Sequence, residues 1–339
     1  MMLTSPVAKQ LQLTLDAIRK LLAANTVALQ DKDITSLKLP YNSLSAHVIT
    51  STNDAELTQI IKKINSRTLA AEMRYQDETY KNNFLHWCVL ADRPKSFELL
   101  LNKGVESMLE QSNVYALSPL QLAAVMGKTT LFSSRFGQIP EFHESHADFS
   151  DHGKKYTINI NELQLAIAFN QNDILKSIFA TFSSMNMHHS KVLQETKIKH
   201  IGNCLHFLSY VSLTLLEDEN AEAIEQLKQT LTLLLSQPIF NKEIIEMLLN
   251  ATYCNYEGLT PIAVAAQYGQ KAWADILKPL YIDCGLNNCV EDAERLLTAF
   301  GKHAEPSKPK IYSASMWKPA TSSSDQAESS SAPYASMNG

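Results

Sequence analysis

The residues best suited to chemistry form one short cluster of histidines and acids, HESHADFSDH at His143–His152. Imidazole and carboxylate groups are ligands that zinc and similar ions accept. The spacing in this cluster matches no established metal motif, and His- and Asp-rich insertions are usually solvated loops. We therefore expect the insertion Gln138–Thr157 to be exposed and to hold no metal or cofactor tightly.

A second candidate site contains cysteine. Its members are Cys284 and Cys289, to which Cys254 and His303 could be added. A structural zinc cluster normally has two tight ligand pairs, whereas this set contains one loose pair. The chain has 5 scattered cysteines, and an odd, scattered set is typical of free thiols in a reducing compartment. We expect idle thiols here.

Composition excludes several classes of function. The 339-residue chain has a net charge of −5 and no basic stripe, which argues against nucleic acid as a partner. No run of about 18 apolar residues exists to insert into a membrane, and the N-terminus lacks the apolar region of a signal peptide. We expect a soluble, cytoplasmic monomer.

Three segments of the chain repeat one pattern, and they could position the candidate residues. They are Asn82–Gly104, Leu117–Phe132 and Leu259–Leu277. Each begins with a helix rich in small residues, continues through a glycine-like stop and ends in a second apolar helix. In the first segment Asp92 holds the stop position. Two helices joined by a tight turn cannot bury their apolar faces alone, so each unit must stack on its neighbours.

These segments resemble the ankyrin repeat, whose first helix carries the signature T-P-L-H-x-A-A-x-x-G. Thr260–Ala266 with Gly269 is a nearly complete copy, and Ser118–Ala124 with Gly127 is another. A third copy combines Leu85-His86 with Leu99–Gly104, and two degenerate copies are Leu163–Asn170 and Cys204–Val211. The resemblance implies an all-α ankyrin-repeat solenoid of about five degenerate repeats, with helical caps at both ends and a disordered C-terminal tail.

The same resemblance divides the chain into four regions. We expect a helical N-terminal capping region over residues 1–76 and the repeats over 77–282. A C-terminal capping helix follows over 283–305, and the Ser- and Pro-rich tail over 306–339 is a candidate secretion signal.

The resemblance also assigns roles to particular residues. His86 and His206 correspond to the scaffold histidine that bonds backbone between repeats, so the neighbouring Cys204 and His206 are interpreted as structural and not as a catalytic pair. Ankyrin repeats bind proteins through their concave side, where exposed aromatic and methionine side chains favour interfaces. The residues expected at this partner-binding surface are Tyr80, Leu90, Tyr115, Val125, Met126, Phe169, Tyr256 and Tyr268.

The resemblance to ankyrin repeats favours a protein–protein interaction scaffold or adaptor as the function. The degenerate repeats and polar tail are similar to Dot/Icm type IV secreted ankyrin effectors of intracellular bacterial pathogens, which implies action on a host protein in the host cytoplasm. One alternative is an enzyme with its active site in the irregular segments 31–53 or 138–157, although no phosphate loop, HExxH or GxSxG motif occurs. Another is an F-box-like ubiquitin-ligase adaptor, suggested by Leu39-Pro40 followed by Leu44, Val48 and Ile49.

The tail generates the first prediction. Deleting residues 306–339 should leave the melting temperature unchanged, because the segment lacks an apolar period that could bury surface. In a bacterium that secretes the protein, the same deletion should abolish translocation of a fused reporter enzyme while expression stays normal. A large drop in melting temperature, or normal translocation of the shortened chain, would contradict these expectations.

Overall fold

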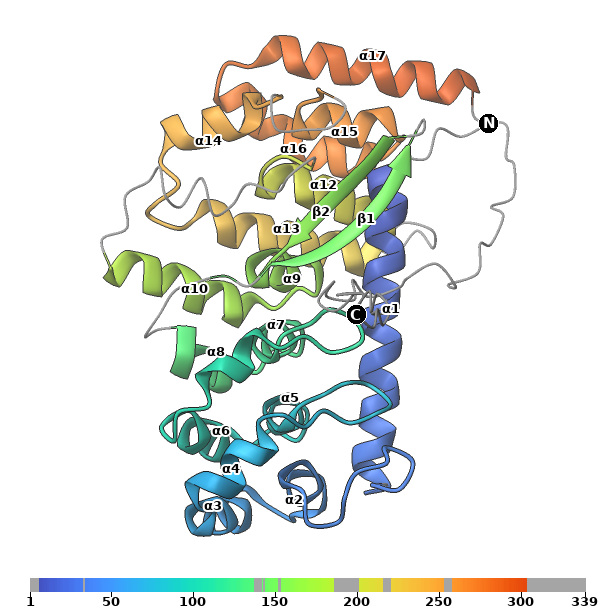
Figure 1. Cartoon of the computed structure of the whole chain (residues 1–339). Helices are drawn as coiled ribbons and strands as arrows, with labels where there is room; N and C mark the ends of the chain where they lie inside the picture. The colour runs from blue at the N-terminus through green and yellow to red at the C-terminus, as the bar shows by residue number, and fades with distance from the viewer. Residues whose placement is uncertain are drawn as a thin grey trace, which may run out of the picture.

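The computed structural model describes residues 6–32, 34–136, 142, 144–151, 154–185, 201–215, 221–252 and 258–303. This part of the chain is mostly helical, and its helices form successive antiparallel pairs stacked along one axis (Figure 1). The pairs are α2 (Leu44–Thr50) with α3 (Asp54–Lys63), α5 (Phe84–Leu90) with α6 (Pro94–Leu101), α7 (Pro119–Val125) with α8 (Thr129–Phe136), α9 (Glu162–Ala168) with α10 (Asn172–Ser184), α12 (Cys204–Leu215) with α13 (Ala221–Leu235), and α15 (Pro261–Gln267) with α16 (Lys271–Asp283).

Every helix of a pair contacts its counterpart in the next pair. The first helices form one continuous row, α2, α5, α7, α9, α12 and α15, and the second helices form a parallel row, α3, α6, α8, α10, α13 and α16. We call these rows the inner and the outer helices. Because α5 and α7 each have an inner helix on both sides and an outer helix behind them, all seven residues of each are buried. Stability therefore comes from contacts between neighbouring units.

The stop positions between the two helices of a pair have the expected backbone conformation. Asp92 and Asn170 have φ angles of 54° and 53°, in the left-handed region, like Gly127 and Gly269 in the equivalent turns. Asn and Asp tolerate this region better than most residues with a side chain. At Gly269 an added Cβ would also meet the ring of Phe300, which would have to shift.

The first pair, α2 and α3, lies in residues 1–76, where we expected only a capping region. α2 packs on α5 and α3 packs on α6, in the same manner as the later pairs. Ser43 caps α2 by accepting a hydrogen bond from the backbone N–H of Ala46. The residues after this cap carry no Thr-Pro-Leu-His pattern. The repeat signature therefore does not predict this pair. Helix α4 (Ser66–Glu72) and a 3-10 helix at Glu106–Glu110 lie in the connections between pairs.

The described residues agree with the all-α expectation apart from one short hairpin in and beside the insertion 138–157. Strands β1 (Ser145–Asp151) and β2 (Lys154–Ile160) form an antiparallel hairpin, with Ser145 opposite Ile160. The cause is visible in β2, whose Tyr156, Ile158 and Ile160 alternate with polar residues, the period of a strand. Helix α14 (Lys242–Asn250) lies between the pair α12–α13 and the pair α15–α16 in the chain.

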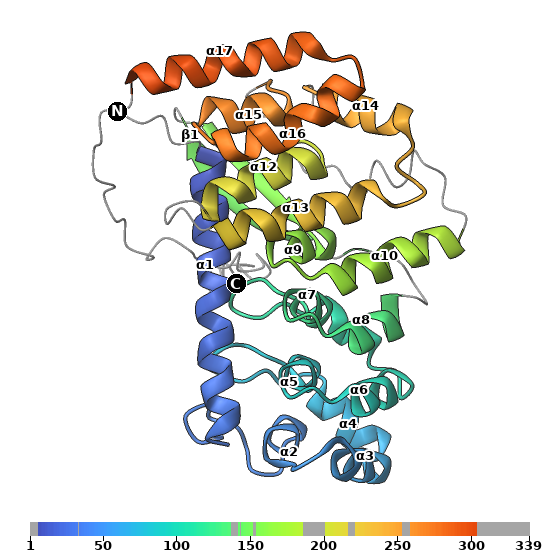
Figure 2. The ribbon, with the colours of Figure 1, turned by 180° about the vertical axis from the view of Figure 1, so that it is seen from behind.

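Two helices outside the pairs complete the molecule. Helix α17 (Asn287–His303) covers α15 and α16 at the C-terminal end of the stack, where a capping helix was expected. Helix α1 (Pro6–Gln30) runs lengthwise along the inner-helix side, across the direction of the paired helices (Figures 1 and 2). The apolar stripe of α1 is buried, at Val7, Leu11, Leu15, Ile18 and Leu21.

Helix α6 receives its N-terminal cap from the neighbouring pair. Its own N-cap residue, Arg93, makes no capping side-chain hydrogen bond. Instead, the Asp54 carboxylate at the start of α3 accepts hydrogen bonds from the backbone N–H groups of Lys95 and Ser96, at 2.8 and 3.0 Å. The bonds join two successive pairs through one side chain, at the helix end where a negative charge is favourable.

We predict that Asp54→Ala lowers the free energy of unfolding by about 1–2 kcal/mol, the usual cost of losing an N-cap. Urea unfolding at pH 7 measures this. A matched control is Asp173→Ala, because Asp173 also lies in the first turn of an outer helix but pairs only with exposed Lys176; there we expect less than about 0.5 kcal/mol. Equal losses in the two variants would show that the cross-pair cap contributes nothing.

Candidate partner-binding surface

The residues predicted to bind a partner occupy two kinds of position. Leu90 and Val125, the last residues of α5 and α7, are only 7% and 1% exposed. The expectation that they face a partner is wrong, because the inner helices are enclosed by their neighbours along their whole length.

The remaining described members are half-buried at the edge of the core. Met126, Phe169 and Tyr268 are the C-cap residues of α7, α9 and α15, one position beyond the buried helix ends. Tyr80 and Tyr115 lie in the loops before α5 and α7 and also pack against the core. The last predicted member, Tyr256, lies outside the described residues.

The two tyrosine loops are held side by side. The backbone N–H of Val114 donates to the Tyr80 carbonyl at 2.9 Å, which links consecutive loops. The pKa of the Tyr80 phenol is raised, mainly by partial burial and to a smaller extent by the nearby Tyr115 and Asp77. The structure therefore brings Tyr80 and Tyr115 together, as a repeating arrangement requires.

The inner-helix side is not open, because α1 occupies it. α1 contacts α5 at one end and α12 and β1 toward the other. The Arg19 guanidinium lies over the Phe169 ring, 5.6 Å from its centroid, so one of the predicted partner-binding residues already has an intramolecular ligand. The surface predicted for a partner is thus covered by the chain's own N-terminal helix.

Polar contacts tie α1 to the loops through three amides. Nδ2 of Asn113 donates to Oδ1 of Asn82 at 3.1 Å, and Nδ2 of Asn82 donates to Oδ1 of Asn25 on α1 at 3.4 Å. Asn25 is fully buried, and its own Nδ2 has no hydrogen-bond partner. A buried donor without a partner costs about 1–3 kcal/mol, so the polar contact between α1 and the stack is incomplete.

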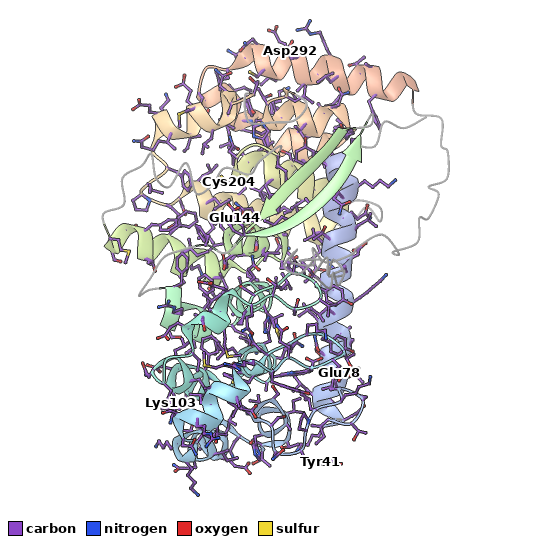
Figure 3. The ribbon with its side chains drawn as sticks, viewed as in Figure 1. Tyr41, Glu78, Lys103, Glu144, Cys204 and Asp292 are labelled. Carbon is purple, nitrogen blue, oxygen red and sulfur yellow. The ribbon has the colours of Figure 1, made fainter. Side chains whose placement is uncertain are left out.

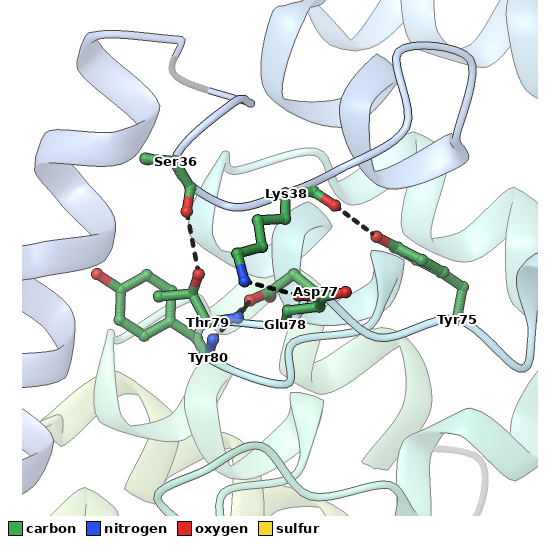
Figure 4. A network of polar contacts seen from close by, with 7 residues as sticks. All are labelled: Ser36, Lys38, Tyr75, Asp77, Glu78, Thr79 and Tyr80. Carbon is green, nitrogen blue, oxygen red and sulfur yellow. Dashed lines mark hydrogen bonds and ion pairs between the residues drawn. The ribbon is translucent and has the colours of Figure 1, made fainter.

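The loop that follows α1 has contacts of its own. Oγ1 of Thr79 donates to the Ser36 carbonyl at 3.1 Å, and the Tyr75 hydroxyl donates to the Lys38 carbonyl at 3.0 Å (Figure 4). Lys38 and Glu78 form an exposed ion pair with an N–O distance of 3.0 Å. These contacts hold the loop, which belongs to the segment 31–53 considered above for an active site, on the end of the stack.

The apolar positions of the F-box-like pattern face inward. Leu39, Leu44, Val48 and Ile49 are at most 5% exposed, and α2 is packed against α5. Tyr41, between these apolar positions, is 80% exposed and projects from this end (Figure 3). The pattern therefore reflects packing of the first helix pair.

The candidate chemical sites do not assemble among the described residues. No three His, Cys, Asp or Glu side chains gather there into a possible metal site. Cys284 and Cys289 are free thiols, the first half-buried and the second buried. Of the acidic and histidine cluster, His143 and His152 lie outside the described residues, while His146, Asp148 and Asp151 belong to β1.

Cys204 and His206 are structural, as interpreted from the sequence. Burial raises the pKa of the Cys204 thiol to about 12, so it is a poor source of the nucleophilic thiolate. Nε2 of His206 donates to the Leu259 carbonyl at 2.8 Å, and its Nδ1 accepts from the Asn203 N–H at 3.3 Å. Both ring nitrogens are therefore occupied by backbone groups.

His86 makes the same bonds at the junction between α5 and α7. Its Nδ1 accepts from the Asn83 N–H at 3.2 Å, and its Nε2 donates to the Leu117 carbonyl at 2.9 Å. At the equivalent position of α7, Oε1 of Gln121 accepts from the Ser118 N–H and its Nε2 donates to the Ile160 carbonyl. A neutral histidine and a glutamine thus perform one structural role, which is to join the cap of one inner helix to the backbone of the next pair.

No protein-family model matches this chain, and no curated protein shows significant similarity to it. None of the described helices is both long and apolar enough to span a membrane.

We predict that acid destabilises the stack through these two histidines. Burial lowers the pKa of His86 and of His206 from 6.5 to about 4, although the carbonyl acceptors oppose that shift. Between these pH values the unfolded chain binds more protons than the folded chain, so the free energy of unfolding falls as pH drops from about 6.5 to about 4. The loss is at most about 3 kcal/mol per histidine.

Urea unfolding between pH 7 and pH 4.5 measures the effect, with the double variant His86→Gln/His206→Gln as the control. Glutamine retains both hydrogen bonds, as Gln121 does, but does not titrate. The double variant should lose less stability on acidification than the original chain. Identical pH profiles of stability for the two proteins would contradict the assignment of the acid effect to these two histidines.

Proposed function

We propose that this protein is an ankyrin-repeat scaffold or adaptor that binds another protein. The observation that carries the proposal is the continuous contact of inner helix with inner helix and outer helix with outer helix along the stack. Such an array presents one long side built from equivalent positions of successive units, which suits protein recognition. The fold class by itself does not identify the partner.

Local details support the ankyrin assignment. The side chains of Ser118 and Thr260, in the positions of the signature threonine, cap their helices, and a proline follows each at the first helical position. The histidines at the signature position bridge successive units, as the resemblance implies for His86 and His206. The glycine-like stops have the left-handed conformation that the motif needs.

We place the partner on the inner-helix side of the stack. The half-buried side chains Tyr80, Tyr115, Met126 and Phe169 lie there at the ends of inner helices and in the loops before them. Aromatic and methionine side chains at a surface bury much area on binding for little loss of rotamer freedom.

The setting in which this binding takes place is also a proposal. The composition of the chain and of its tail supports a bacterial effector that acts on a host protein after type IV secretion. The enzyme alternative gains no support from the described residues, because the polar groups of the loop before α2 serve in contacts with the stack.

The double variant Tyr115→Ser/Met126→Ser tests the binding surface. We expect at least a tenfold loss of affinity for a partner captured from eukaryotic lysate, about 1.4 kcal/mol, because both side chains contribute apolar contact area. Circular dichroism should still show a cooperative melting transition.

A matched control replaces two half-buried apolar residues away from the inner helices, Ile245→Ser/Ile276→Ser on α14 and α16. This control should bind normally. Normal binding by the Tyr115/Met126 variant, or its unfolding, would remove the inner-helix side as the binding surface.

A further inference from the structure

We propose that the surface beneath α1 is a binding site for an amphipathic helix of the partner, and that α1 occupies this site in the free protein. The inference rests on the proposed scaffold function and adds the chemistry of the partner. It follows from how α1 is attached to the stack.

α1 contacts the stack as a bound helix would. It is 25 residues long and belongs to no helix pair, so at 1.5 Å per residue it spans about 37 Å of the inner-helix side. Its buried positions recur every three or four residues from Val7 to Ala28, and all of them except Asn25 are apolar. This is the pattern by which an amphipathic helix lies in a groove.

The attachment of α1 contains a weak point. Asn25 interrupts the apolar stripe, its hydrogen bond from Asn82 is 3.4 Å long, and its Nδ2 is buried without a partner. Removing α1 would let water satisfy this amide, which favours release of the helix at this point. The inner-helix rows, by contrast, carry short hydrogen bonds at the histidine and glutamine junctions.

The neighbouring loop allows α1 to leave without opening the end of the stack. Ile34, Leu37 and Leu39 of that loop are buried. The Thr79 and Tyr75 hydroxyls hold the loop through backbone carbonyls, so these bonds do not depend on α1 (Figure 4). Release of α1 therefore need not disturb the α2–α3 pair.

α1 also shows which partner fits the site. A competing helix needs apolar side chains at three- and four-residue spacing over about six or seven turns. It needs a cationic side chain where Arg19 lies over Phe169 and a hydrogen-bonding side chain opposite Asn82. A partner side chain that accepts the hydrogen bond from Asn82 without burying an unpaired N–H group would fit this point better than Asn25 does.

The first test is hydrogen exchange of the full chain, followed by mass spectrometry. If α1 leaves the stack by local opening, its amides should exchange at least about 100-fold faster than those of α7 and α12, which open only with the stack. Equal protection of α1 and these inner helices would make α1 a permanent part of the core and overturn the proposal.

The second test uses the full-length double variant Leu15→Asp/Leu21→Asp, which places two charges in the buried stripe and should release α1. A fluorescein-labelled peptide of residues 6–30 should then bind with micromolar affinity. The same peptide should bind the unaltered chain at least about tenfold more weakly, because the attached α1 competes at millimolar effective concentration. The matched control is Leu13→Asp/Val27→Asp, at exposed positions 40% and 55% accessible, which should behave as the unaltered chain.

The remaining outcomes are also decisive. Unfolding of the stack in the Leu15/Leu21 variant, or failure of the peptide to bind it, would overturn the proposal. A dimer of the unaltered chain by light scattering, formed through exchange of α1, would replace the partner helix by a second copy. A partner that binds while α1 stays protected would leave the scaffold function intact and overturn only the site beneath α1.

Discussion

The enclosure of each inner helix by its neighbours is the constraint on which the rest of this structure depends. A seven-residue helix such as α5 is too short to be stable alone, yet every one of its residues is buried. Burial on all sides requires that its backbone ends find partners within the stack. The caps from Asn83 and Ser118, and the bridges from His86 and Gln121, meet that requirement at successive junctions.

The same enclosure decides which residues remain for function. Leu90 and Val125 within the inner helices are buried, so the recognition that we propose uses the residues just beyond the helix ends and in the preceding loops. α1 lies over this row of residues and contributes Arg19 and Asn25 to it. The binding surface and the N-terminal helix must therefore be considered together, since any ligand on this side meets α1.

Histidine and cysteine, the residues that first suggested chemistry, act here through their burial. A buried imidazole whose two nitrogens contact backbone groups cannot exchange protons freely, and a buried thiol is held in its neutral form. His206 and Cys204 follow this rule on one helix of the stack. Their contribution is to stability and its pH dependence.

The sequence by itself determined the local units. The capping residues, the glycine-like stops at Asp92 and Asn170, and the apolar stripe of α1 could all be predicted because they depend on neighbours within one or two turns. Only the tertiary structure revealed the α2–α3 pair, whose helices lack the motif but are positioned by packing on α5 and α6. It also decided that β1 and β2 form a hairpin and that α1 covers the predicted binding side. Those features depend on contacts between residues far apart in the chain. The apolar pattern of a helix shows that one of its faces is buried, but it does not show which surface of the protein covers that face.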